Sequence, residues 1–224
     1  MRGLRLGFGS TRAAVLAVGL ASAAPVAAIE PAPLPPLLYT LPEAGSYELP
    51  VIDRVGPHSL LDAEGQARPV LAAPEGGVAL IAFVYLHCTD ARGCPLALAS
   101  LQHADRAIAA RPDLRNRVRL VTVSFDPGRD SPEAMRGLRH HMAPKGDWRF
   151  LTGASQADIE PVLVDFGQDA VPVMTEQGSN TGLMRHVAKV FLVDSEGGVR
   201  NVYSSGFLDH RLLMRDLETL LPGG

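Results

Sequence analysis

Two cysteines, with five residues between them, carry the most reactive side chains of this sequence. Cys88 and Cys94 are its only cysteines in 224 residues, too few for a disulfide scaffold but enough for one redox pair or part of a metal site. A thiolate is both a redox nucleophile and a metal ligand. A structural disulfide across so short a loop would contribute only about 2–3 kcal/mol. Redox chemistry, metal binding and a structural disulfide all remain open from the pair alone.

The segments on either side of the cysteines predict a strand that leads into a helix. The apolar run Val78–Leu86 is typical of a strand buried on both faces. Residues Pro95–Ala110 repeat apolar side chains at helical spacing, and Pro95 suits a first helical position. Ligands bind at such strand-to-helix connections in open α/β sheets. Cys94 is expected near the helix N-terminus, where the dipole would stabilise its thiolate.

The remaining pattern predicts an α/β protein with a thioredoxin-like fold: a central mixed β-sheet flanked by helices, with an N-terminal β-hairpin extension. A proline at position 161 predicts a kink or a later start in the third helix. The predicted elements, in chain order, are short strands within Tyr47–Leu71, a strand at Val118–Phe125, a helix capped by Ser131, a helix at Ser155–Phe166, a hairpin of Val187–Val193 and Val199–Ser204, and a helix at Leu208–Leu221.

The N-terminus is typical of an export signal. Arginines precede the apolar stretch Ala13–Ala24, and small residues before Ile29 suit cleavage. The stretch is shorter than the roughly 20 residues that span a bilayer. We expect a signal peptide at 1–28, a proline-rich linker at 29–46 and a single domain at 47–224. Export to the periplasm of a Gram-negative bacterium would place the thiols in an oxidising compartment, and an uncleaved N-terminus would tether the protein to the membrane.

The charge balance argues against a nucleic-acid partner. Lysine and arginine total 21, aspartate and glutamate total 24, and the net charge is −3. The sequence also lacks a run of basic residues, which proteins that bind nucleic acids commonly carry.

Several motifs occur in an order that resembles one known family. They are Leu86-His87-Cys88-Thr89-Asp90, Cys94-Pro95, the stretch Val121–Glu133 (VTVSFDPGRDSPE), Arg149–Gly153 (RFLTG), and His186 ahead of Val190–Asp194 (VFLVD). Over residues 47–221 the chain resembles the Sco (SenC) family, copper chaperones for cytochrome c oxidase assembly. The family has three residues between its cysteines where this chain has five. The longer loop either still brings both sulfurs to one metal or has lost copper binding.

The resemblance implies a copper site made by Cys88, Cys94 and His186. Cu(I) is soft and prefers thiolates, and imidazole is a borderline partner. Copper, as Cu(I) or Cu(II), would be received in the periplasm. It would be delivered to the binuclear centre of cytochrome c oxidase subunit II, or to another periplasmic copper protein. Such a metallochaperone need not be an enzyme.

Other functions and other ligands stay open. A periplasmic thiol-disulfide oxidoreductase would use Cys88 and Cys94 as its redox pair and would not need His186. A peroxidase and a silent structural domain are weaker alternatives. His87 is a substitute ligand, and a loop is expected at Glu176–Leu183 near His186. Three methionines are soft donors that packing explains better: Met142, Met174 and Met184.

Overall fold

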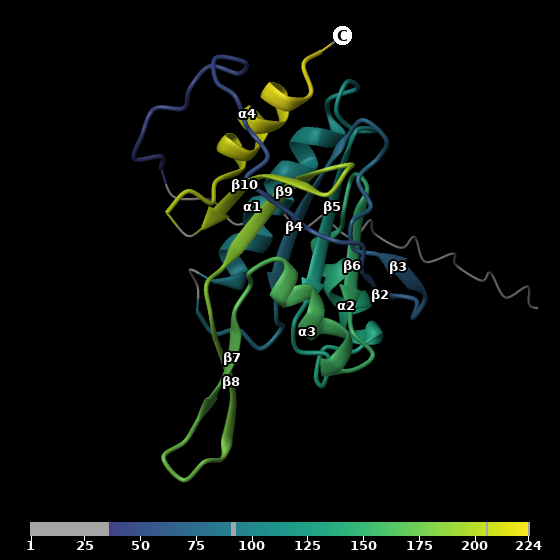
Figure 1. The fold of residues 1–224 in the computed structure, drawn as a ribbon, viewed down its shortest axis with the longest axis vertical. Helices are drawn as coiled ribbons and strands as arrows, with labels where there is room; N and C mark the ends of the chain where they lie inside the picture. Colours follow the sequence, from purple (N-terminus) through teal and green to yellow (C-terminus); the bar gives the residue numbers. More distant parts are fainter. Residues whose placement is uncertain (1–35, 91–92, 205, 224) are drawn as a thin grey trace, which may run out of the picture.

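The computed structural model describes residues 36–90, 93–204 and 206–223 (Figure 1). The predicted signal peptide and the first part of the predicted linker lie outside the described residues. Residues 36–46 of that linker contain no helix or strand, and Gly45 N–H donates to Thr219 Oγ1 of the last helix. Among the described helices, none has the length and apolar character to span a bilayer.

An eight-stranded mixed sheet forms the centre of the fold, in the order β1-β10-β9-β4-β5-β6-β2-β3. Strands β4, β5 and β6 run parallel, β9 is antiparallel to β4, and the β2–β3 hairpin extends the far edge. The strands are β1 (Asp53–Arg54), β2 (Ser59–Asp62), β3 (Ala67–Pro69), β4 (Val78–Val84), β5 (Val118–Ser124), β6 (Trp148–Thr152), β9 (Lys189–Asp194) and β10 (Gly198–Ser204).

Strand β4 is central because both of its faces are apolar. All seven of its residues are buried. Successive side chains of a strand point to opposite faces, so Leu80 and Ala82 join one core cluster while Ile81 and Phe83 join the other.

Four helices cover the two faces of the sheet (Figure 1). They are α1 (Cys94–Ala109), α2 (Pro132–Met142), α3 (Gln156–Asp165) and α4 (His210–Leu220). Helices α1, α2 and α4 pack into the cluster that contains Leu80, whereas α3 packs into the cluster that contains Ile81. The mixed sheet with helices on both faces confirms the predicted thioredoxin-like fold, and it leaves the cysteines at the carboxyl end of β4.

Two local predictions and one omission need correction. Helix α3 does not start later at Pro161: it begins at Gln156 and runs through the proline. A proline at the sixth helical position removes one backbone hydrogen bond, and the capping box of Ser155 and Asp158 supports this end of the helix. Strand β6 was not predicted as a strand. The expected loop at Glu176–Leu183 is partly a strand, because β8 begins at Asn180.

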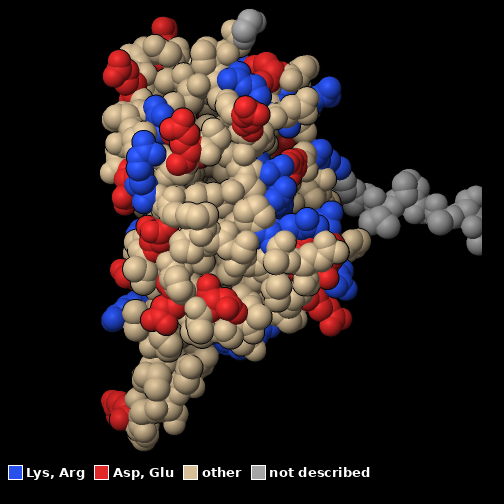
Figure 2. All heavy atoms as spheres, turned by 45° about the vertical axis from the view of Figure 1, so that its right-hand side comes forward, with Lys and Arg blue, Asp and Glu red and all other residues tan. Residues whose placement is uncertain are grey.

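A second, two-stranded sheet projects from the body as a hairpin of β7 (Ala170–Met174) and β8 (Asn180–His186) (Figure 1). Within the part of the chain that the structure describes, each strand pairs only with the other. Figure 2 shows both signs of charge interspersed over the body, whereas the hairpin at its lower end is almost wholly uncharged on this face. The hairpin exposes apolar side chains at Val171, Val173, Met174 and Leu183.

Candidate metal centre

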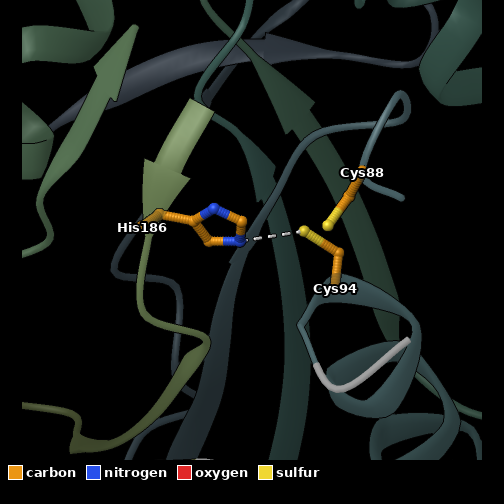
Figure 3. Close-up of side chains that lie close together, drawn as sticks. All are labelled: Cys88, Cys94 and His186. Atoms are coloured by element: carbon orange, nitrogen blue, oxygen red, sulfur yellow. Dashed lines mark hydrogen bonds between the residues drawn. The ribbon is translucent and has the colours of Figure 1, made fainter. Parts of the chain in front are cut away.

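The three predicted ligands meet at the carboxyl end of β4. One donor atom each from Cys88, Cys94 and His186 lies within 4.8 Å of the other two. In Figure 3 the His186 ring extends from the end of β8 toward Cys94 at the start of α1, and Cys88 approaches from the preceding loop. We call these three residues the donor cluster. Within the described residues, no other group of three or more His, Cys, Asp or Glu side chains has the spacing of a metal site.

The two cysteines differ in exposure. Cys94 is 2% exposed and Cys88 is half-buried, and both are free thiols. Gly93 allows Cys88 to lie close to the start of α1, because a Cβ at position 93 would stand only 3.3 Å from Cys88 Sγ. The longer loop therefore still places both sulfurs beside one histidine.

Burial overrides the expected helix-dipole effect at Cys94. Cys94 lies at the N-terminus of α1, as predicted, although the helix begins at Cys94 itself and not at Pro95. The Tyr85 backbone N–H donates to Cys94 Sγ at 3.5 Å. Burial nevertheless raises the pKa of the Cys94 thiol well above its usual range. The expectation of a stabilised thiolate was wrong for the metal-free protein. Metal binding must therefore displace the proton of this thiol.

His186 directs its Nε2 atom toward Cys94. It is the last residue of β8. Its Nδ1 lies 3.2 Å from the Met184 carbonyl oxygen, which can only accept, so Nδ1 carries the proton. The lone pair of neutral His186 then sits on Nε2, 3.4 Å from Cys94 Sγ. A backbone carbonyl that fixes the tautomer in this way is typical of ligating histidines.

Two aromatic side chains form a wall behind the donor cluster that the sequence did not reveal. The His186 ring lies edge-on to Tyr85, with centroids 5.4 Å apart, and 5.1 Å from the ring of Phe125. The phenol oxygen of Tyr85 accepts the Met184 N–H at 3.4 Å, and the Cys88 thiol donates to the Asp90 carbonyl oxygen at 3.8 Å. Burial raises the pKa of Tyr85. The only sequence signal for this wall was the place of Tyr85 and Phe125 at the ends of the adjacent strands β4 and β5.

The alternative ligands lie in different surroundings. The Nδ1 atom of His87 is 3.7 Å from Asp130 Oδ1, and His87 is not a member of the donor cluster. Met142 is buried in the core, and Met174 is exposed on the hairpin. Met184 packs, partly buried, against the same apolar cluster as Cys88.

The difference in exposure predicts selective alkylation. Iodoacetamide attacks thiolates, and Cys94 is both buried and protonated at neutral pH. We expect the reduced, folded protein to be labelled at Cys88, with Cys94 labelled only after unfolding. Peptide mass spectrometry at pH 7 measures both sites in one sample. Equal labelling of the two cysteines in the folded protein would contradict the described geometry.

Comparisons with known proteins agree on one family. Residues 50–222 match the family model described as SCO1/SenC. A protein of Bacillus subtilis named SCO1 protein homolog is 25% identical over 135 residues, which are 60% of this chain and 65% of that protein. The match thus spans slightly less than two thirds of that relative's length.

Solved structures extend the likeness to three dimensions. The structure of Bradyrhizobium japonicum ScoI with copper bound is 27% identical and superimposes with a TM-score of 0.56, covering 72% of this chain and 99% of that one. The apo Sco1 protein of Thermus thermophilus is 25% identical, with a TM-score of 0.61, over 75% of this chain and 92% of that one.

Proposed function

Because the chain belongs to the SCO1/SenC family, we propose that it binds copper through Cys88, Cys94 and His186 and delivers it to another protein. The observation that carries this proposal is the donor cluster itself: two sulfurs and one imidazole nitrogen lie within 4.8 Å of one another. The copper-bound Bradyrhizobium japonicum structure, which shares this fold, supports the choice of metal.

The donor set suits Cu(I) chemically. Two thiolates and one imidazole make a soft three-coordinate site. The aromatic wall excludes water from one side of the cluster, and the half-buried Cys88 leaves the other side open to exchange. A site with few ligands and one accessible sulfur can hold copper and still release it to a partner with similar ligands.

The proposed setting is the periplasm, and the proposed recipient is the binuclear copper centre of cytochrome c oxidase subunit II. The export signal predicted at 1–28 supports the location. Membership of the SCO1/SenC family supports the recipient. Another periplasmic copper protein is the alternative recipient.

Removal of His186 tests the ligand set. We expect the reduced wild type to take up one Cu(I) per chain in anaerobic competition with a chromogenic chelator. Removal of an outer-shell partner commonly weakens metal binding about 10–100-fold. Because His186 is proposed as a direct ligand, the His186→Ala variant should lose at least this much Cu(I) affinity. His140→Ala is the matched control, because His140 is exposed on α2, and it should match the wild type. Unchanged affinity in His186→Ala would refute the assigned ligands, and no competitive binding by the wild type would refute copper delivery.

Thiol-disulfide exchange is a second candidate function, favoured by the closeness of the two sulfurs. In this reaction Cys88 and Cys94 would each lose a proton and together give two electrons to an oxidant. A partner disulfide is such an oxidant, and its bond would break as the Cys88–Cys94 bond forms. The same His186→Ala variant separates the functions: an oxidoreductase would retain its exchange rate with dithiothreitol, whereas copper affinity would fall.

A further inference from the structure

One short segment contacts both halves of the donor cluster. Residues Phe125–Asp130, here named the bridging segment, connect β5 to α2. The cysteines belong to the connection between β4 and α1, whereas His186 belongs to the hairpin. Among the described residues, the hairpin shares no strand pairing with the main sheet. Strand β9, which begins three residues after His186, pairs with β4 and brings the two parts to the same end of the sheet, so contacts beyond this pairing are needed to fix the distance between the donor atoms.

Asp130, the last residue of the bridging segment, accepts a hydrogen bond from the backbone just before the cysteine loop. Asp130 is 0% exposed, and its Oδ2 accepts the Leu86 backbone N–H at 3.0 Å and the Ser124 hydroxyl at 2.6 Å. Leu86 lies two residues before Cys88. The Oδ1 atom of Asp130 has no hydrogen-bond partner and faces His87 Nδ1 at 3.7 Å. A buried carboxylate of this kind is costly, which indicates a role beyond packing.

The next residue back in the chain, Arg129, lies against the hairpin. The Arg129 guanidinium is fixed by an ion pair with Asp126, whose Oδ2 accepts from Nε at 2.6 Å. Its Nη1 lies 2.9 Å from where a Cβ of Gly182 would stand, so it occupies the space of a missing side chain on β8. Gly182 also has a φ of +78°, which favours glycine there. Gly182 and His186 both belong to β8, with three residues between them.

Phe125, the first residue of the bridging segment, packs against the His186 ring. Phe125 is 0% exposed, and its backbone N–H donates to Val84, the last residue of β4, at 3.0 Å. Its ring lies 5.1 Å from the His186 ring. The bridging segment therefore contacts the cysteine loop at one end, the histidine at the other and the hairpin between them.

We propose that the bridging segment sets the spacing of the donor cluster, with Asp130 as a positioning residue for the cysteine loop and Arg129 as a positioning residue for the hairpin that carries His186. This inference rests on the proposed copper site and names the residues that align it. Outer-shell contacts that orient ligands commonly change metal affinity about 10–100-fold when they are removed. Asp130 and Arg129 act on different ligands, so their effects should be separable.

A double-mutant cycle separates the two roles. We expect Arg129→Ala to weaken Cu(I) binding about tenfold in the wild-type background, the lower end of that range, and to have no further effect in the His186→Ala background. Asp130→Ala should weaken binding in both backgrounds and shift the reduction potential of the Cys88/Cys94 pair, which Arg129→Ala should leave unchanged. Asp130→Asn keeps an acceptor for Leu86 and should recover most of the affinity. Arg139→Ala on α2 is the matched control, because it breaks only an exposed ion pair with Glu64.

Two readouts in the metal-free protein test the inference apart from copper binding. Amide hydrogen exchange of β8 should quicken in Arg129→Ala, and exchange of Leu86 should quicken in Asp130→Ala, at unchanged midpoints of global unfolding. If the wild type binds no copper, these readouts and the reduction potential still decide the inference. Equal losses from Arg129→Ala with and without His186, or unchanged exchange at both positions, would overturn it.

Discussion

The Cys94→Ser variant is expected to lose high-affinity Cu(I) binding and, with it, any disulfide to Cys88. Serine keeps the shape of cysteine but offers a hard hydroxyl that Cu(I) does not favour. The loss should exceed the roughly 10–100-fold typical of an outer-shell partner, because a direct ligand disappears. Anaerobic chelator competition measures the affinity, and free-thiol titration after mild oxidation measures the disulfide.

The matched comparison is Cys88→Ser, which removes the half-buried sulfur and keeps the buried one. Both variants should bind weakly if each sulfur is a ligand. Cys94 is buried in an apolar cluster, so its replacement can destabilise the fold. The unfolding midpoint of the Cys94→Ser variant must therefore be measured as well, so that weak binding by unfolded protein is not mistaken for loss of a ligand. Tight binding by a folded Cys94→Ser protein would refute its role.

The Asp216→Ala variant is expected to lose about 3 kcal/mol of unfolding free energy, because it leaves several hydrogen-bond donors without an acceptor. Asp216 on α4 is 1% exposed and accepts from Tyr203 Oη at 2.6 Å, from Asn201 Nδ2 at 2.8 Å and from Tyr47 Oη. Burial and the hydrogen bond to Asp216 raise the pKa of Tyr47 to about 12. The carboxylate thus joins α4, β10 and the start of the domain.

Urea unfolding of the reduced, metal-free protein measures this loss. Asp216→Asn is the control, because an amide retains one acceptor oxygen and should cost less than alanine. The donor cluster is made by other elements, so copper affinity should stay unchanged while Asp216→Ala remains folded. A loss below about 1 kcal/mol, the net value of a single ordinary hydrogen bond, would show that water replaces the carboxylate.

Hydrophobic patterning predicted the elements that carry the cysteines well. Strand β4 is apolar on both faces, and α1 begins beside a proline, so local sequence alone determines the two elements. Strand β6 was harder, because its five residues include Trp148 and Arg149 and show no clear alternation. The hairpin of β7 and β8 was harder still to predict. The sequence of β8 is largely exposed and contains Gly182, which is typical of a loop, and it forms a strand by pairing with β7.

The donor cluster was predictable in identity but not in electrostatics. The motif order resembled a family and named Cys88, Cys94 and His186, which the fold brings together. The dipole argument for Cys94 was wrong because it considered only the helix, whereas burial depends on residues distant in the sequence. The roles of Tyr85 and Phe125 were missed for the same reason, since neither is next to a ligand until the strands align.

The hairpin of β7 and β8 has a consequence for how quickly metal could leave. It pairs only with itself and lies apart from the main sheet, and elements with few ties to a core open locally far more often than the whole domain unfolds. His186 would then detach while the two sulfurs keep the metal. The residence time of the cargo would be governed by this local opening, so a partner that captures the open hairpin would speed release without destabilising the protein that brought the ion.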